Sequence, residues 1–119
     1  MEDLPLLEVG ALERLEEWGG PQMQRRMIEI FLSYTPDRIN QIKEGFSRAE
    51  ASAVEAGAHT LKSSAGNLGA TRLQELCEEV ERIAEGRDLG ELDRLLPELE
   101  AAYSATRLEL EKLLKGMKE

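Results

Sequence analysis

The chain has a single histidine, and the residues at helical spacing after it are a cation and small side chains. His59 is followed by Lys62 and Ser63, and then by Gly66 and Ala70. Residues three and four apart are neighbours on a helix, so these five positions are predicted to line one face. A neutral imidazole is a nucleophile near neutral pH, an ammonium can offset the charge of phosphoryl oxygens, and small residues let another protein come close. This combination suits phosphoryl transfer, which depends mainly on positioning and charge neutralisation.

Other polar residues near this face have supporting or structural interpretations. Glu55 lies one helical turn before His59 and is a candidate hydrogen-bond partner for the ring. Asn67 lies near the same face and is a candidate partner contact. Cys77 falls within an apolar stripe and is predicted to be buried, whereas the glutamates of 75–82 are predicted to form a solvated face.

The elements that must position this face are predicted to be helices. Ala, Glu, Lys, Arg and Leu make up more than half of the chain, a balance that favours helices over sheet. Apolar residues recur at steps of three and four, and Gly or Pro separates the runs. The pattern predicts a short helix over about 9–18 and long helices over about 21–47, 50–68, 70–85 and 88–116.

Two prolines fall inside these runs. The apolar stripe continues in phase past Pro36, which favours one bent helix, and Pro97 either kinks the last helix or begins its main part. Each predicted helix has one apolar stripe. The stripe of the short helix over 9–18 includes Trp18, and the stripe of the helix over 21–47 includes Met23, Ile30 and Tyr34. Short links between amphipathic helices predict an all-α, up-and-down antiparallel four-helix bundle, a single domain over 1–119 with the short helix as a cap.

Charge and composition exclude several classes of function. Twenty-four acidic against 15 basic residues give a net charge of −9, with no basic surface for nucleic acid or an anionic membrane. No apolar run approaches the ~20 residues that span a bilayer, and the acidic start lacks the features of a signal peptide. We expect a cytoplasmic protein, and a monomer, because one bundle uses every stripe.

The region around the histidine resembles the signature of histidine-containing phosphotransfer (HPt) domains, roughly Ala-His-x-Leu-Lys-Gly-Ser-x-x-x-x-Gly. The residues that match are His59, Leu61, Lys62, Ser64 and Gly69, and Ala70 also fits. Ser63 stands where glycine is commoner, but serine is still small. The run 31–38 resembles the family's Phe-Leu-x-x-Thr-Pro-x-Arg, and the resemblance extends from about Leu12 to Leu110.

The resemblance implies a function as well as a fold. It implies a phosphorelay carrier in which His59 accepts a phosphoryl group from a receiver-domain aspartate of a hybrid sensor kinase and passes it to a response regulator. Lys62 would shield the phosphoryl charge, and Ser63, Gly66, Asn67 and Ala70 would contact the partner. No kinase module is visible, and no cofactor is expected in this chain, because Mg²⁺ would be held by the receiver domain.

Two other functions would use some of the same sequence features. A non-catalytic helical adaptor would explain the amphipathic helices but gives no reason for His59 and Lys62 to share a face with small residues. A bundle metalloprotein needs Glu-x-x-His pairs on two helices, and the chain has one histidine and no such pair, so no metal is expected.

Overall fold

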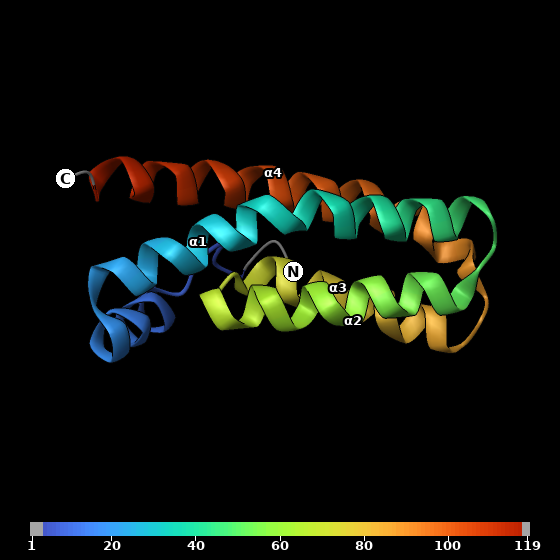
Figure 1. The fold of residues 1–119 in the computed structure, drawn as a ribbon. Helices are drawn as coiled ribbons and strands as arrows, with labels where there is room; N and C mark the ends of the chain where they lie inside the picture. Colours follow the sequence, from blue (N-terminus) through green and yellow to red (C-terminus); the bar gives the residue numbers. More distant parts are fainter. Residues whose placement is uncertain (1–3, 118–119) are drawn as a thin grey trace.

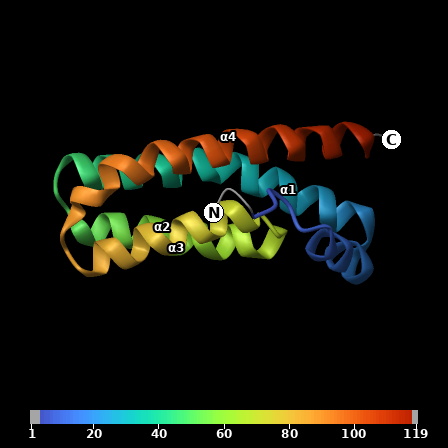
Figure 2. The ribbon, with the colours of Figure 1, turned by 180° about the vertical axis from the view of Figure 1, so that it is seen from behind.

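The computed structural model describes residues 4–117, and within them it contains helices and no strand. The elements are α1 (Val9–Ser47), α2 (Ala51–Leu68), α3 (Thr71–Glu85), a short 3₁₀ helix η1 (Leu89–Glu91) and α4 (Leu92–Gly116) (Figures 1 and 2). The predicted bounds of the long helices lie within a few residues of these. Among the described helices, none is long and apolar enough to span a membrane.

The four helices form an elongated antiparallel bundle of 46 × 26 × 21 Å (Figure 1). The main contacts join α1 to α2, α2 to α3, α3 to α4, and α4 back to α1. Each helix therefore packs against the one before it and the one after it, which is the arrangement that short connections favour. The prediction of an all-α four-helix bundle is confirmed.

Helix α1 consists of two helical segments on either side of a sharp bend at Gly20. This residue has φ 79° and ψ 179°, a backbone conformation that glycine adopts readily. The first segment folds back against the second at this end of the bundle (Figure 1). It corresponds to the short cap helix predicted over about 9–18. Beyond Gly20, α1 continues as one helix through Pro36, as the continuous apolar stripe predicted.

The core differs from the predicted stripe at four positions of α1. Trp18, Met23, Ile30 and Tyr34 are exposed, so their predicted burial was wrong. For the three residues after the bend, the physical reason is the phase of the second segment, whose buried positions are 28, 31, 35, 39, 42 and 45. A surface helix buries only a limited stripe, and this stripe leaves Ile30 and Tyr34 outside it.

The turn between α2 and α3 is tightly built. Gly69 ends α2 with φ 75°, and the amide of Ala70 donates to the carbonyl of Ala65 over 2.8 Å, a helix ending for which glycine is preferred. The N-terminal segment covers this turn, because the amide of Glu8 donates to the carbonyl of Gly69 over 2.7 Å. The turn therefore fixes α2 and α3 side by side.

Candidate functional site

His59 lies on the outer surface of α2, and its side chain is 63% exposed. The adjacent residue Ala58 and the nearby Leu61 are fully buried, so the inner face of the helix is anchored in the core. Helix α1 also packs closely at this level, since a Cβ on Gly57 would come within 2.9 Å of the Ile42 side chain. The histidine is thus an accessible group on a helix whose inner face is closely packed in the core.

The ring of His59 is held by a residue of the next helix. Nδ1 of His59 lies 2.8 Å from Oε2 of Glu81 on α3, and Oε1 of the same carboxylate lies 2.8 Å from Nζ of Lys62. The Glu81 side chain is only 12% exposed. One carboxylate therefore joins the histidine and the lysine that the sequence singled out.

This contact corrects two expectations from the sequence. Glu55 was the candidate partner of the ring, and Glu81 was assigned to a solvated face, but Glu81 makes the contact to Nδ1. The sequence does contain a signal for the contact between His59 and Glu81. The two residues lie equally far on either side of Ala70, which is at the turn between two antiparallel helices. Residues placed symmetrically about such a turn come to lie opposite each other, which local helical spacing cannot reveal.

The charges at the site stabilise one another. The hydrogen bond from Lys62 is the largest cause that lowers the pKa of the Glu81 carboxyl, and the contact with His59 lowers it further. The same bond raises the pKa of Lys62, with Glu78 and Glu85 adding to the effect. Glu81 is therefore an ionised carboxylate at neutral pH, and Lys62 is a cation.

Beneath these groups lies Cys77, which is fully buried. Burial raises the pKa of its thiol to about 12, so that it is protonated and unreactive under ordinary conditions. The predicted core position of Cys77 is confirmed.

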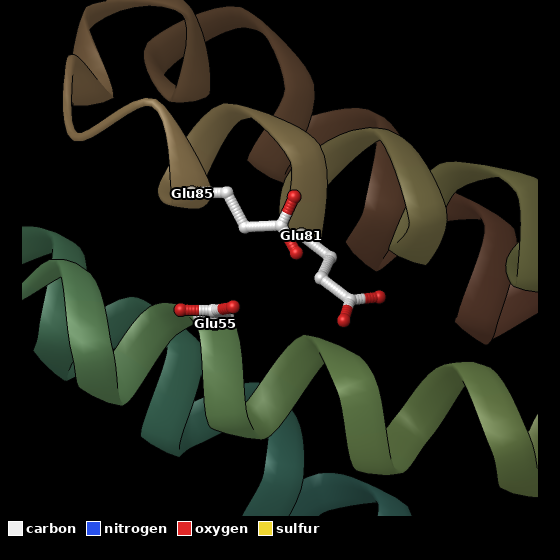
Figure 3. A group of neighbouring side chains, drawn as sticks. All are labelled: Glu55, Glu81 and Glu85. Carbon is white, nitrogen blue, oxygen red and sulfur yellow. The ribbon is translucent and has the colours of Figure 1, made fainter.

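Two more carboxylates approach Glu81. Figure 3 shows Glu55 reaching from α2 toward Glu81 and Glu85 on α3, and oxygens of the three lie within 4.8 Å of one another. Lys62 provides a positive charge at one side of this group. Exposed acidic groups of this kind are common without a bound ion, and the expectation that the chain binds no metal stays a prediction.

The predicted partner contacts fall into different environments. Ser63 and Asn67 are exposed on α2, and Gly66 is partly exposed beneath Gln74, whose amide would lie 2.7 Å from a Cβ on Gly66. Ala70 is completely buried. Its prediction as a surface contact was wrong because α2 ends at Leu68 and the chain turns inward before α3.

A hollow lies between α1 and α2, and one of its lining residues, Thr60, directly follows the histidine in the sequence. It is lined by Ile30, Tyr34 and Arg38 of α1 and by Thr60 and Ser64 of α2. The side chains of Ile30 and Tyr34 are exposed apolar groups in this hollow, and sequence reasoning missed them as site residues because it assigned both to the core.

Comparison with known proteins gives two matches. Residues 26–116 match the Hpt domain family. The fold is similar to the crystal structure of histidine-containing phosphotransfer protein B (HptB) from Pseudomonas aeruginosa PAO1, with a TM-score of 0.89 and 21% sequence identity over 95% of this chain and 97% of that chain. No match was found among the curated proteins.

Proposed function

Because the chain belongs to the Hpt domain family, whose members carry phosphoryl groups in phosphorelays, we propose that His59 is the residue that is phosphorylated. It is the only histidine in the chain. The observation that supports this role best is its exposed ring, held at Nδ1 beside an ammonium group. Such a site is sparse, but a carrier needs little more when its partner supplies the activated phosphoryl group.

The proposed partners are receiver domains, one on a hybrid sensor kinase and one on a response regulator. His59 attacks the phosphorus of an aspartyl phosphate, and the phosphoryl group passes to the ring as the aspartate leaves. Lys62 offsets the charge on the phosphoryl oxygens during transfer. Mg²⁺ is assigned to the acidic pocket of the receiver, and this chain is proposed to act as a carrier without kinase activity of its own.

The docking face is proposed to surround His59. Ser63 and Asn67 lie exposed on α2, and Ile30 and Tyr34 add apolar surface from α1. Exposed apolar side chains next to a polar reaction centre are typical of a protein interface. We propose a cytoplasmic monomer that presents this face to each receiver in turn.

The test is transfer of label from a panel of phosphorylated receiver domains to the protein. We expect the wild type to take up acid-labile, base-stable label, and His59→Gln to take up none while it keeps its helical circular dichroism spectrum. Lys62→Met should slow transfer by at least about tenfold, because one charge-stabilising group is lost. Arg107→Met is a matched control, since Arg107 pairs with Glu111 on α4 and should not affect transfer.

The other reading, a non-catalytic adaptor, makes the opposite prediction. It would be supported if no receiver and no small phosphodonor labelled the folded wild type. It would also be supported if His59→Gln kept full signalling activity in cells. Either result would contradict phosphotransfer through His59.

A further inference from the structure

The ring of His59 lies between side chains of opposite charge on its own helix. Lys62 follows it by one turn of α2, and Glu55 precedes it by one turn. A second hollow, next to the ring, has Glu55, His59 and Glu81 among its lining residues. We propose that Glu55 raises the free energy of the phosphorylated state, so that this chain is a strong phosphoryl donor to receiver domains. This inference rests on the proposed function of His59.

Negative charge exceeds positive charge around the ring. Glu81 and Lys62 form an ion pair, with 2.8 Å between Oε1 and Nζ, so their charges largely offset each other. Carboxylate oxygens of Glu55 and Glu85 lie within 4.8 Å of each other and of Glu81 (Figure 3). Within residues 4–117, neither Glu55 nor Glu85 takes part in an ion pair. A glutamate carboxylate carries a negative charge near neutral pH, so two such charges remain beside the histidine without a cation to offset them.

Phosphorylation of the ring adds to this negative charge. A bond forms between a ring nitrogen of His59 and phosphorus, the bond from phosphorus to the aspartate oxygen breaks, and the aspartate leaves with that electron pair. The transferred group, PO₃⁻, adds one negative charge to the chain, and that charge is spread over its oxygens. Lys62 is already bound to Glu81, so it offsets this charge only in part. Glu55, on the other side of the ring, repels it.

The repulsion changes the equilibrium between the two carriers. Glu55 acts on the phosphorylated form of this chain, whereas the phosphorylated receiver is unaffected when the two proteins are apart. The equilibrium between phosphohistidine and phosphoaspartate therefore lies further toward the receiver than it would without Glu55. One pair of like charges a helical turn apart at a partly exposed site changes an equilibrium by about threefold.

This effect can be separated from a simple docking contact. If Glu55 only contacted the docked receiver, its removal would change the rates of forward and reverse transfer by the same factor. The equilibrium between the separate proteins would then be unchanged, because a contact that does not distinguish two states cannot shift the balance between them. Only a group that interacts differently with the phosphorylated and unphosphorylated chain moves the equilibrium constant.

The chain offers matched variants for this test. Glu55 is partly exposed on α2, and Glu55→Gln removes the charge while it keeps the length of the side chain and the helix propensity. Glu55→Lys reverses the charge. Glu98→Gln is the control, because Glu98 is an exposed glutamate of α4 that pairs with Arg94 and does not line the hollow beside the ring.

The experiment uses the full chain with one receiver domain that exchanges label with the wild type. The two proteins are mixed at concentrations too low for a stable complex, starting from either labelled protein, and the ratio of phosphohistidine to phosphoaspartate is measured when both directions agree. As a readout without any partner, the chain is phosphorylated with phosphoramidate, a small phosphodonor, and its phosphorus magnetic resonance signal is followed over a range of pH. Circular dichroism confirms that each variant is folded.

We expect Glu55→Gln to shift the equilibrium about threefold toward phosphohistidine, and Glu55→Lys to shift it at least about fivefold in the same direction. The phosphorus signal of Glu55→Gln should titrate at a lower pH than that of the wild type, because a nearby negative charge favours the protonated form of an acidic group. Glu98→Gln should match the wild type in both measurements, because its charge is distant and screened.

Three results would overturn the inference. An unchanged equilibrium constant in folded Glu55→Gln, whether or not the rates change, would show that Glu55 does not act on the phosphorylated state. A shift toward phosphoaspartate would show that Glu55 stabilises that state. An equal shift in Glu98→Gln would show that overall charge is responsible. If the wild type takes no label from phosphoramidate or from any receiver, the proposed function itself fails, whereas a failure at Glu55 alone leaves His59 labelled.

Discussion

At the scale of residues, the Lys62–Glu81 pair should make the stability of the bundle depend on pH in a defined way. The pKa of Glu81 is lowered from 4.5, so the unfolded state binds more protons as the solution is acidified. The contribution of Glu81 to the free energy of unfolding is complete above its ordinary pKa. It is lost as the pH falls through the lower pKa of the folded state. The pKa of Lys62 is raised from 10.5, so its contribution is complete below that value and is lost in more alkaline solution.

Chemical unfolding of wild type and Glu81→Gln over a range of pH measures this effect. The difference in the free energy of unfolding should be constant between about pH 6 and 9 and should shrink below about pH 4.5. His59, Glu55, Glu78 and Glu85 also face the pair, so Glu78→Gln serves as the control and should lack this acid-side decrease. A difference that stays constant down to acidic pH would contradict the lowered pKa of Glu81.

Residue types and local spacing were enough to identify His59 and Lys62 as a pair, because both lie on one helix. Glu81 was missed because its contact depends on the register between two helices, and that register is set by the turn at Gly69 and Ala70. The same turn explains the error at Ala70, which is drawn into the core. Local patterns therefore predict which residues share a helix face, but not which residue of the next helix meets them.

At the scale of elements, the α2–α3 turn should be sensitive to a single methyl group. Gly69 has φ 75°, and an added Cβ would lie 2.7 Å from the Cβ of Ala11 and 2.8 Å from the carbonyl oxygen of Glu8. Gly69→Ala should lower the free energy of unfolding by about 1–3 kcal/mol, through backbone strain and displacement of the N-terminal segment.

Thermal or chemical unfolding measures this loss. Gly116→Ala is the matched control, because no atom lies within 4 Å of an added Cβ there, and it should change stability by less than about 1 kcal/mol. Equal stability of Gly69→Ala and wild type would show that the N-terminal segment is not packed on this turn.

Helix positions were predictable for the most part because glycine and proline mark the ends of clear apolar repeats. The repeat did not fix which stripe of α1 faces inward. Ile30 and Tyr34 fit a helical spacing with Met23 and Met27, but the stripe through Ile28, Phe31 and Ile39 fits the core. Which of two apolar stripes on one helix is buried can be decided only when the neighbouring helices are in place. Here Ile30 and Tyr34 of the unburied stripe line a hollow between α1 and α2.

At the scale of the whole molecule, the bundle should remain a monomer of 13.3 kDa in solution. The core is filled within one chain, and the net charge of −9 makes copies repel one another. A stable dimer would bury roughly 1,200–2,000 Å² of surface, and the exposed apolar side chains Ile30 and Tyr34 are the ones proposed to receive the partner. Self-association through them would cover the site.

Light scattering coupled to size exclusion tests this expectation at low and at high salt. The mass should stay that of one chain in both, since screening the charge does not change the core, which is filled within one chain. Should a dimer form, Tyr34→Gln separates two explanations. If the variant is monomeric, the face beside His59 is an interface between copies, and the proposed docking of receivers there is contradicted. If it remains dimeric, the contact lies elsewhere, and only the monomer prediction is wrong.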